Sequence, residues 1–120
     1  MLTKNHILTS VARRTTVLAS PVFGGDIHMQ ELLRSAWRDA SRAADLGNDL
    51  IDLDVWHAHL FAALVVDADG TPMFTAADVL AWPKRDAVWS EIRRVANEGL
   101  ALSEVGPEAV KSGDSAADAG

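Results

Sequence analysis

The spacing of hydrophobic and polar positions changes character early in the chain. Leu2 to Leu8 can form a short helix, with Thr3 as its N-cap. The segment over about 13–31 differs, because β-branched residues precede Pro21 and apolar residues alternate with polar ones after a Gly-Gly turn. This pattern predicts a β-hairpin. Since an isolated hairpin is only marginally stable in water, it must pack on the segments that follow.

Apolar residues then recur at helical spacing over about 32–103. The first helix is predicted from Glu31 to about Leu46, with Gly47-Asn48 as its stop signal. Its expected buried stripe consists of Leu33, Ala36 or Trp37, Ala40 and Ala44. The second helix is predicted over Leu53 to Val65, with Asp52 as its cap. Its main face should contain Leu53, Trp56, Leu60, Ala63 and Leu64, broadened by Phe61 and Val65. Because this helix is apolar around much of its circumference, we expect it at the centre of the fold.

Two further helices are predicted. Thr75 and Asp78 have the spacing of a capping box, which predicts a short helix that Pro83 ends. The last helix should run from about Ala87 to Ala101, with Asp86 as its cap. The sequence therefore predicts one α+β domain, mostly α, over 1–105, with a short N-terminal helix, a hairpin and a bundle of about four helices. Residues 106–120 are predicted to form a flexible tail, because Gly, Ser, Ala, Asp and Glu dominate them and Ser112 to Gly120 contain no apolar residue larger than Ala.

Composition and charge narrow the classes of partner. The chain has 120 residues, a hydrophobic fraction of 48% and a net charge of −6, and its basic residues are scattered. Nucleic acid is therefore disfavoured, since phosphate binding needs clustered Lys and Arg. No apolar run is long enough for a membrane span, and polar residues interrupt any N-terminal signal peptide. The chain has no cysteine, which excludes disulfides and thiolate sites and fits a cytoplasmic protein.

The acidic turn after residue 66 invites a calcium interpretation that its spacing rejects. Asp67, Asp69 and Asp78 fit the first, third and last ligand positions of an EF-hand loop. Gly70, however, comes two residues before the position of the invariant glycine, and the last ligand is Asp rather than a bidentate Glu. A plain turn explains these residues better.

The histidines do not have the spacing of a metal site. They are His6, His28, His57 and His59. On a helix, side chains two residues apart point roughly 200° away from each other, so His57 and His59 cannot chelate one ion. We expect His28 to be exposed on the polar side of the hairpin.

The chain also lacks recognisable catalytic motifs. It has no Gly-x-Ser-x-Gly elbow, and Gly24-Gly25 has neither the dinucleotide nor the P-loop spacing. The acidic pair Asp52 and Asp54 is explained by the start of a helix. The sequence predicts no enzyme activity, no cofactor and no metal.

Four tryptophans are many for a chain without tyrosine, and they are Trp37, Trp56, Trp82 and Trp89. They can fill the core, or some can lie on a surface that accepts apolar segments of another protein. Trp82, which precedes Pro83, and Trp89, which lies off the main stripe of its helix, are the better candidates for exposure. The predicted partner-binding residues are Trp82, Trp89, Phe61 and Trp37.

Three short blocks resemble the tail assembly chaperones of long-tailed, siphophage-type bacteriophages. The N-terminal block consists of Leu2, Thr3, Lys4, Ile7 and Leu8. The second block, around the hairpin, consists of Pro21, Gly24, Gly25, Ile27, Met29 and Leu32. The third consists of Val65, Asp67, Gly70, Phe74, Thr75, Asp78 and Val79. The resemblance covers about 2–103. Phe23 replaces the family's usual Trp before Gly-Gly, and Gln30 replaces an Arg common on the second strand.

The resemblance implies a function. Members of this family coat the tape measure protein and keep it soluble, and they recruit tail tube subunits, often through a longer form made by ribosomal frameshifting. They act in the host cytoplasm and are absent from the mature virion. Copies of the chain itself are a further candidate partner. The alternative is a minor structural tail or head-tail component retained in the virion.

Overall fold

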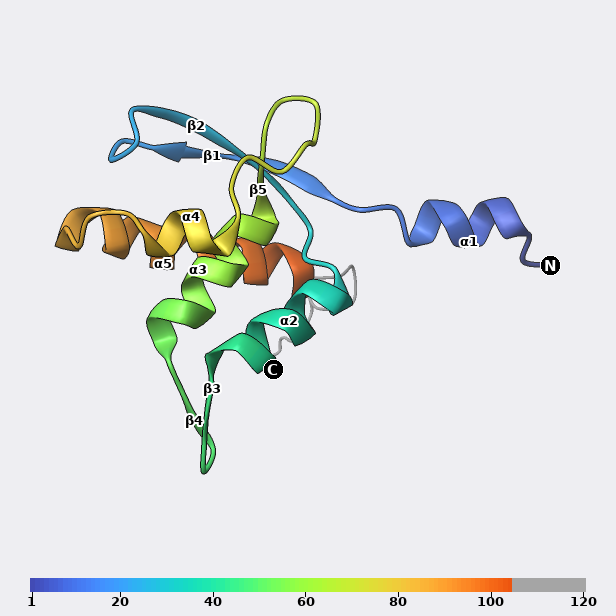
Figure 1. The fold of residues 1–120 in the computed structure, drawn as a ribbon. Coiled ribbons are helices and arrows are strands. Elements are labelled where there is room, and N and C mark those ends of the chain that lie inside the picture. Colours follow the sequence, from blue (N-terminus) through green and yellow to red (C-terminus); the bar gives the residue numbers. More distant parts are fainter. Residues whose placement is uncertain (105–120) are drawn as a thin grey trace, which may run out of the picture.

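The computed structural model describes residues 1–104, so the predicted tail at 106–120 lies outside the described part. The fold is α+β and mostly helical, as predicted, with an N-terminal helix and hairpin followed by helices (Figure 1). The elements are α1 (Lys4–Ser10), β1 (Thr15–Ser20), β2 (Gly25–Gln30), α2 (Arg34–Ala44), β3 (Asp45–Gly47), β4 (Leu50–Ile51), α3 (Leu53–Leu64), β5 (Val65–Val66), α4 (Ala76–Leu80) and α5 (Asp86–Glu104).

The predicted hairpin is present, and it forms most of a three-stranded antiparallel sheet with the order β1-β2-β5. Thr15 pairs with Gln30 at the open end, and Ser20 pairs with Gly25 at the tip. Strand β5 was not predicted. Val65 was predicted as the last residue of the second helix, and the pairing of Val65 and Val66 with β2 makes them a strand instead.

Helix α3 lies at the centre of the fold, as predicted, and packs against α2, α4 and α5. Asp52 caps it by accepting hydrogen bonds from the backbone N–H groups of Asp54 and Val55. One side contributes Ala58, Phe61, Ala62 and, with β5, Val65 to a core that also contains Ile27, Met29, Val79, Ile92 and Val95. The other side contributes Leu60 and Leu64 to a smaller cluster with Ala40 and Ala96. Leu53, predicted on the buried face, is exposed, because it is the first residue of the helix and lies beyond its packed length.

Helix α2 is shorter than predicted at both ends. It begins at Arg34 instead of Glu31, because the chain is still leaving the sheet at that point: the backbone N–H of Glu31 donates to the carbonyl of Arg14. Beyond Ala44 the chain forms a second small hairpin, β3-β4, instead of a last helical turn. Ala40 and Ala44 are buried as predicted, whereas Leu33 and Trp37 are exposed.

The two C-terminal helices largely follow the prediction. Thr75 and Asp78 form the reciprocal hydrogen bonds of a capping box at α4. Asp86 is the first residue of α5 rather than its cap, and the helix continues past Ala101 to Glu104. Ser103 then ties the helix to the chain after the sheet, because its hydroxyl accepts a hydrogen bond from the backbone N–H of Leu32.

Helix α1 projects away from the rest of the molecule (Figure 1). Thr3 caps it as predicted, and His6 completes a capping box. None of its residues is buried. Over the part of the chain that the structure describes, none of the helices combines the length and apolar character that a membrane span requires.

Candidate partner-binding site

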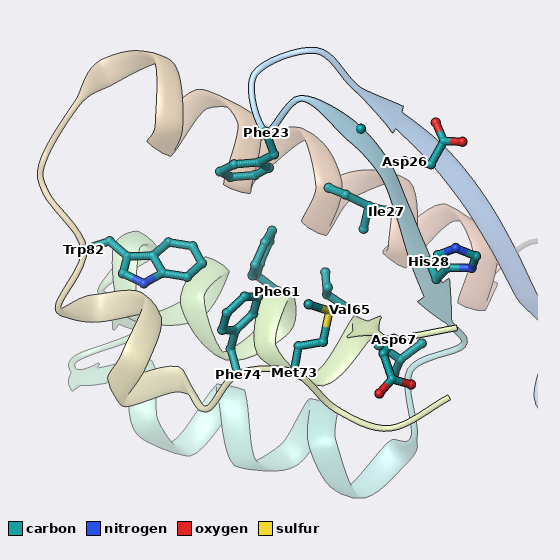
Figure 2. Close-up of a pocket in the computed structure, with 12 residues that line it drawn as sticks. Phe23, Asp26, Ile27, His28, Phe61, Val65, Asp67, Met73, Phe74 and Trp82 are labelled. Carbon is teal, nitrogen blue, oxygen red and sulfur yellow. The ribbon is translucent and has the colours of Figure 1, made fainter. Parts of the chain in front are cut away.

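Four aromatic rings meet between the hairpin tip, α3 and the segment around α4 (Figure 2). The Phe61 ring from α3 lies 5.8 Å from the Trp82 ring and 6.3 Å from the Phe74 ring, measured between centroids. Phe23 lies 6.1 Å from Phe61, and Phe74 packs edge-on to Trp82 at 5.1 Å. These spacings are in the range in which aromatic pairs attract one another, so the cluster is a cohesive apolar surface.

These rings form one end of an open pocket of about 390 Å³, which we call the aromatic pocket. Its apolar lining is completed by Ile27, Val65, Val66 and Met73, and Asp67 lies at its rim. Asp26 and His28 border it from β2, but Figure 2 shows the Asp26 carboxylate directed away from the aromatic rings. Phe61 is buried at its floor, while Phe23 and Met73 are 40% and 53% exposed. The pocket therefore offers an open apolar cavity, which suits a large apolar side chain.

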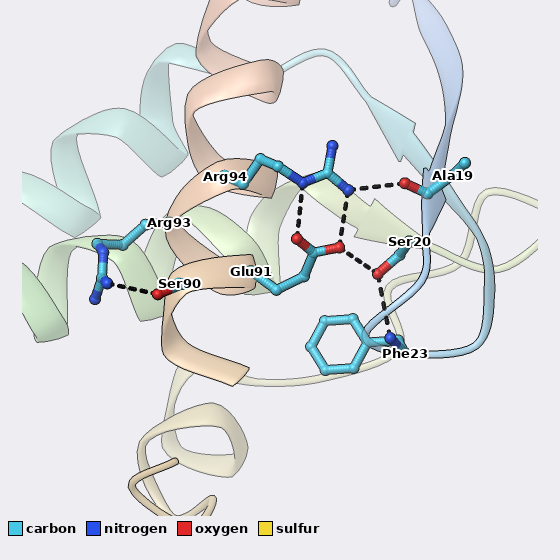
Figure 3. A network of polar contacts seen from close by, with 7 residues as sticks. All are labelled: Ala19, Ser20, Phe23, Ser90, Glu91, Arg93 and Arg94. Atoms are coloured by element: carbon cyan, nitrogen blue, oxygen red, sulfur yellow. Dashed lines mark hydrogen bonds and ion pairs between the residues drawn. The ribbon is translucent and has the colours of Figure 1, made fainter. Parts of the chain in front are cut away.

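The position of Phe23 is fixed by a polar network behind the hairpin (Figure 3). The buried Glu91 carboxylate accepts hydrogen bonds from the Ser20 hydroxyl and, at 2.7 and 2.8 Å, from the Arg94 guanidinium. The same guanidinium donates to the Ala19 carbonyl, and Ser20 Oγ accepts from the Phe23 backbone N–H. The hydrogen bonds from Arg94 hold the pKa of Glu91 below its usual value, so the carboxylate is charged when it anchors the hairpin tip.

A second apolar patch lies on the opposite side of α3. Trp37 of α2 packs edge-on against Trp56, with centroids 4.8 Å apart, and Trp37 is 42% exposed. Leu32 and Leu100 lie beside Trp37 in a second open depression of about 520 Å³, which Arg34 and Arg38 also line. We call Trp37 with these two leucines the Trp37 patch.

The four predicted partner-binding residues are thus divided between different places. Trp82 and Phe61 lie together in the aromatic pocket, whereas Trp37 lies in the Trp37 patch. Trp89 is half-buried against the core, and its Nε1 donates to the Pro83 carbonyl. Phe23 and Phe74 also line the pocket, and we did not predict them as site residues. Phe74 belongs to the third block of the family resemblance, and Phe23 stands where the family usually has a Trp, so these two positions were the available signal.

Glu31 and His57 are two further titratable groups with shifted pKa values. Glu31 accepts hydrogen bonds from the side chain and backbone of Arg14, and these lower the pKa of its carboxyl. His57 is buried, and its Nδ1 has no hydrogen-bond partner among the described residues. Burial, assisted by the positive charge of Arg93, lowers the pKa of His57. His28 is exposed, as predicted. Within residues 1–104 no cluster of three or more His, Asp or Glu could hold a metal ion.

The fold of this chain is similar to that of a solved structure. The structure of the bacteriophage HK97 tail assembly chaperone matches 86% of this chain and 97% of its own length, with a TM-score of 0.56 and 18% sequence identity. No family model and no curated protein matches the sequence. The resemblance inferred from three short sequence blocks is therefore confirmed as a shared fold.

Proposed function

We propose that this chain is a non-enzymatic tail assembly chaperone of a long-tailed bacteriophage. In this proposal it binds the tape measure protein, keeps it soluble and helps to recruit tail tube subunits, the latter through a longer frameshifted form. It acts in the host cytoplasm and does not remain in the virion. The observation that supports this most strongly is the fold shared with the HK97 tail assembly chaperone over nearly the whole of that protein.

The surface of the molecule is compatible with such a role. A chaperone for a long helical client needs apolar surface that accepts side chains at helical spacing, and many weak contacts along one client add up through multivalency. The aromatic pocket and the Trp37 patch both offer exposed apolar side chains on opposite sides of α3. We propose that client segments contact Trp82 and Phe61 in the pocket and Trp37 in the patch.

Co-expression tests the proposal. The tape measure protein of the same phage genome should stay in the supernatant when this chain is co-expressed with it and precipitate without it. Met73→Asp should weaken this effect by placing a charge in the aromatic pocket, and Trp37→Asp should do so at the patch. Ala68→Asp in the same loop as Met73 and Ala43→Asp on α2 are matched controls, because both positions are exposed and lie outside the two sites. A client that precipitates equally with and without the wild-type chain would refute the proposal.

Mass spectrometry of purified virions tests the alternative. A chaperone is absent from the finished particle. Stoichiometric copies in mature tails would instead identify the chain as a structural tail or head-tail component.

A further inference from the structure

Helix α2 carries a row of exposed arginines. Arg34, Arg38 and Arg42 follow one another at intervals of four residues, so they form a row about 12 Å long on one side of the helix. None of the three forms a salt bridge or a side-chain hydrogen bond within residues 1–104. Solvated charges are common on helix surfaces, so the meaning of this row depends on what lies beside it.

The row borders the Trp37 patch. Trp37 directly precedes Arg38, and its side chain is 42% exposed. Arg34 and Arg38 line the same open depression of about 520 Å³ as Trp37, Leu32 and Leu100. Apolar surface and positive charge therefore lie side by side along α2. This arrangement is complementary to an amphipathic helix that has acidic residues at the edge of its apolar face.

The charge of α2 is opposite to that of the chain as a whole. The helix contains three arginines and one aspartate, which gives it a formal charge of +2. Because the whole chain carries −6, the other 109 residues carry −8. An acidic ligand is therefore repelled by the molecule as a whole and attracted locally at α2, so binding there depends on contact with this helix.

A polypeptide fits this surface better than a nucleic acid does. Leu32 and Leu100 are aliphatic and can take up the apolar side chains of a helix, whereas nucleic acid binding depends on clustered cations and on aromatic rings for stacking. Trp37 packs edge-on against Trp56 with centroids 4.8 Å apart, so its ring has a fixed place in the patch.

We propose that the Trp37 patch binds an acidic amphipathic helix of the client. Apolar side chains of this helix lie against Trp37, and its carboxylates, about four residues apart, lie opposite Arg34, Arg38 and Arg42. This inference rests on the proposed function, because it assigns the acidic helix to the tape measure protein.

Two synthetic peptides test the charge requirement. Both are alanine-based helices of equal length with leucines at i, i+3, i+4 and i+7, and with Glu in one and Lys in the other at every fourth position beside the leucines. In fluorescence anisotropy titrations with the full chain, the Glu peptide should bind roughly ten-fold more tightly than the Lys peptide, as expected for three exposed ion pairs. Its affinity should fall as salt is added. Since the net charge of the chain favours the Lys peptide, non-specific attraction cannot produce this preference.

Three variants locate the binding on α2. Arg38→Glu should weaken binding of the Glu peptide roughly ten-fold, because a repulsion replaces an attraction. Trp37→Ala should weaken it roughly thirty-fold, as expected for a central aromatic anchor. Arg85→Glu makes the same change of charge at an exposed position outside the depression, next to the opposite end of α5 from Leu100, and should bind like the wild type. Circular dichroism shows that each variant is folded, and the exposure of Arg38 makes its replacement the safer test.

Several results would overturn the proposal. They are a Glu peptide that binds no more tightly than the Lys peptide, and an Arg38→Glu chain that binds the Glu peptide like the wild type. Tighter binding of an oligo-dT strand would assign the patch to nucleic acid, and a changed sedimentation of the Arg38→Glu chain by itself would assign it to a second copy.

The co-expression assay separates this inference from the proposed function. If the client precipitates even with the wild-type chain, the proposed function fails. If the client is protected by the wild type and equally well by Arg38→Glu, the proposed function holds and the acidic helix at α2 is refuted. Loss of protection with Arg38→Glu but not with Arg85→Glu supports both.

Discussion

Gly99 lies inside α5, where a glycine normally weakens a helix, and its contact with α3 explains why a larger residue should not fit. A Cβ atom at this position would lie 2.3 Å from Cδ1, 2.7 Å from Cδ2 and 2.9 Å from Cγ of Leu64. Leu64, the last residue of α3, is fully buried and packs in one cluster with Ala40 of α2 and Ala96 of α5. Its side chain therefore has little room to move away from an added methyl group.

The size of the effect follows from two opposing contributions. Replacing glycine by alanine in a helix interior favours folding by about 1 kcal/mol. Overpacking a tight core costs about 1–3 kcal/mol, and a contact of 2.3 Å places this site near the upper limit. Gly99→Ala should therefore lower the free energy of unfolding by about 1–2 kcal/mol. In a Leu64→Ala background all three obstructing atoms are gone, so the same substitution should raise it by about 1 kcal/mol.

A double-mutant cycle measures this change of sign. Urea unfolding followed by tryptophan fluorescence gives the free energy of unfolding for the wild type, the two single variants and the double variant. Asn97, an exposed position in the same helix, calibrates the propensity contribution through the difference between Asn97→Ala and Asn97→Gly. If Gly99→Ala stabilised the wild type, or shifted both backgrounds equally, the close approach of Leu64 would not be the reason for this glycine.

Ser20, Glu91, His57 and Asp49 give four further predictions. Ser20→Ala removes a hydrogen bond to the buried Glu91 carboxylate and should lower the free energy of unfolding in urea by about 1–3 kcal/mol. The pKa of Glu91 lies below its usual 4.5, so the charged carboxylate stabilises the fold above that pH. This stabilisation is lost as the pH falls through the lowered pKa. Glu91→Gln should therefore flatten that loss of stability. Burial lowers the pKa of His57 below 6.5, so protonation of this side chain opposes folding, and stability should decline as the pH falls below 6.5. His57→Leu should remove that part of the decline, as measured by urea titrations at stepped pH. Asp49 has a φ of +62°, and Asp49→Gly should raise the Tm through a gain of about 0.5–1 kcal/mol; an unchanged or lower Tm would contradict this.

The sequence predicted correctly those features that depend only on neighbouring residues. Thr3, Asp52 and Thr75 cap their helices because capping depends on a few neighbouring residues. The same local reasoning placed Val65 in the second helix and predicted no strand there, since a short apolar run has the same appearance in a buried helix and in a buried strand. Only the pairing with β2, far away in the sequence, distinguishes the two.

The candidate site was predictable only in part for a related reason. Tryptophan content drew attention to Trp82 and Trp37, but the aromatic pocket joins Phe23, Phe61, Phe74 and Trp82 from four separate segments. Each of them taken alone is an ordinary apolar residue after a turn or on a helix. The sequence alone does not indicate which of them converge, because that depends on how the hairpin lies across α3 and α5.

That arrangement depends on a contact with no local signature. Glu91 and Arg94 have the spacing of an exposed ion pair on a helix surface, yet Glu91 is buried because Ser20, 71 positions earlier, bonds to it. Since Ser20 Oγ also accepts the backbone N–H of Phe23, one wall of the aromatic pocket is already ordered before anything binds there. Binding to a preorganised pocket avoids the entropic cost of ordering that wall. Ser20→Ala should therefore weaken the proposed client binding at the aromatic pocket as well as stability, whereas a substitution that acts on stability alone, such as Gly99→Ala, should leave client binding by the folded chain unchanged.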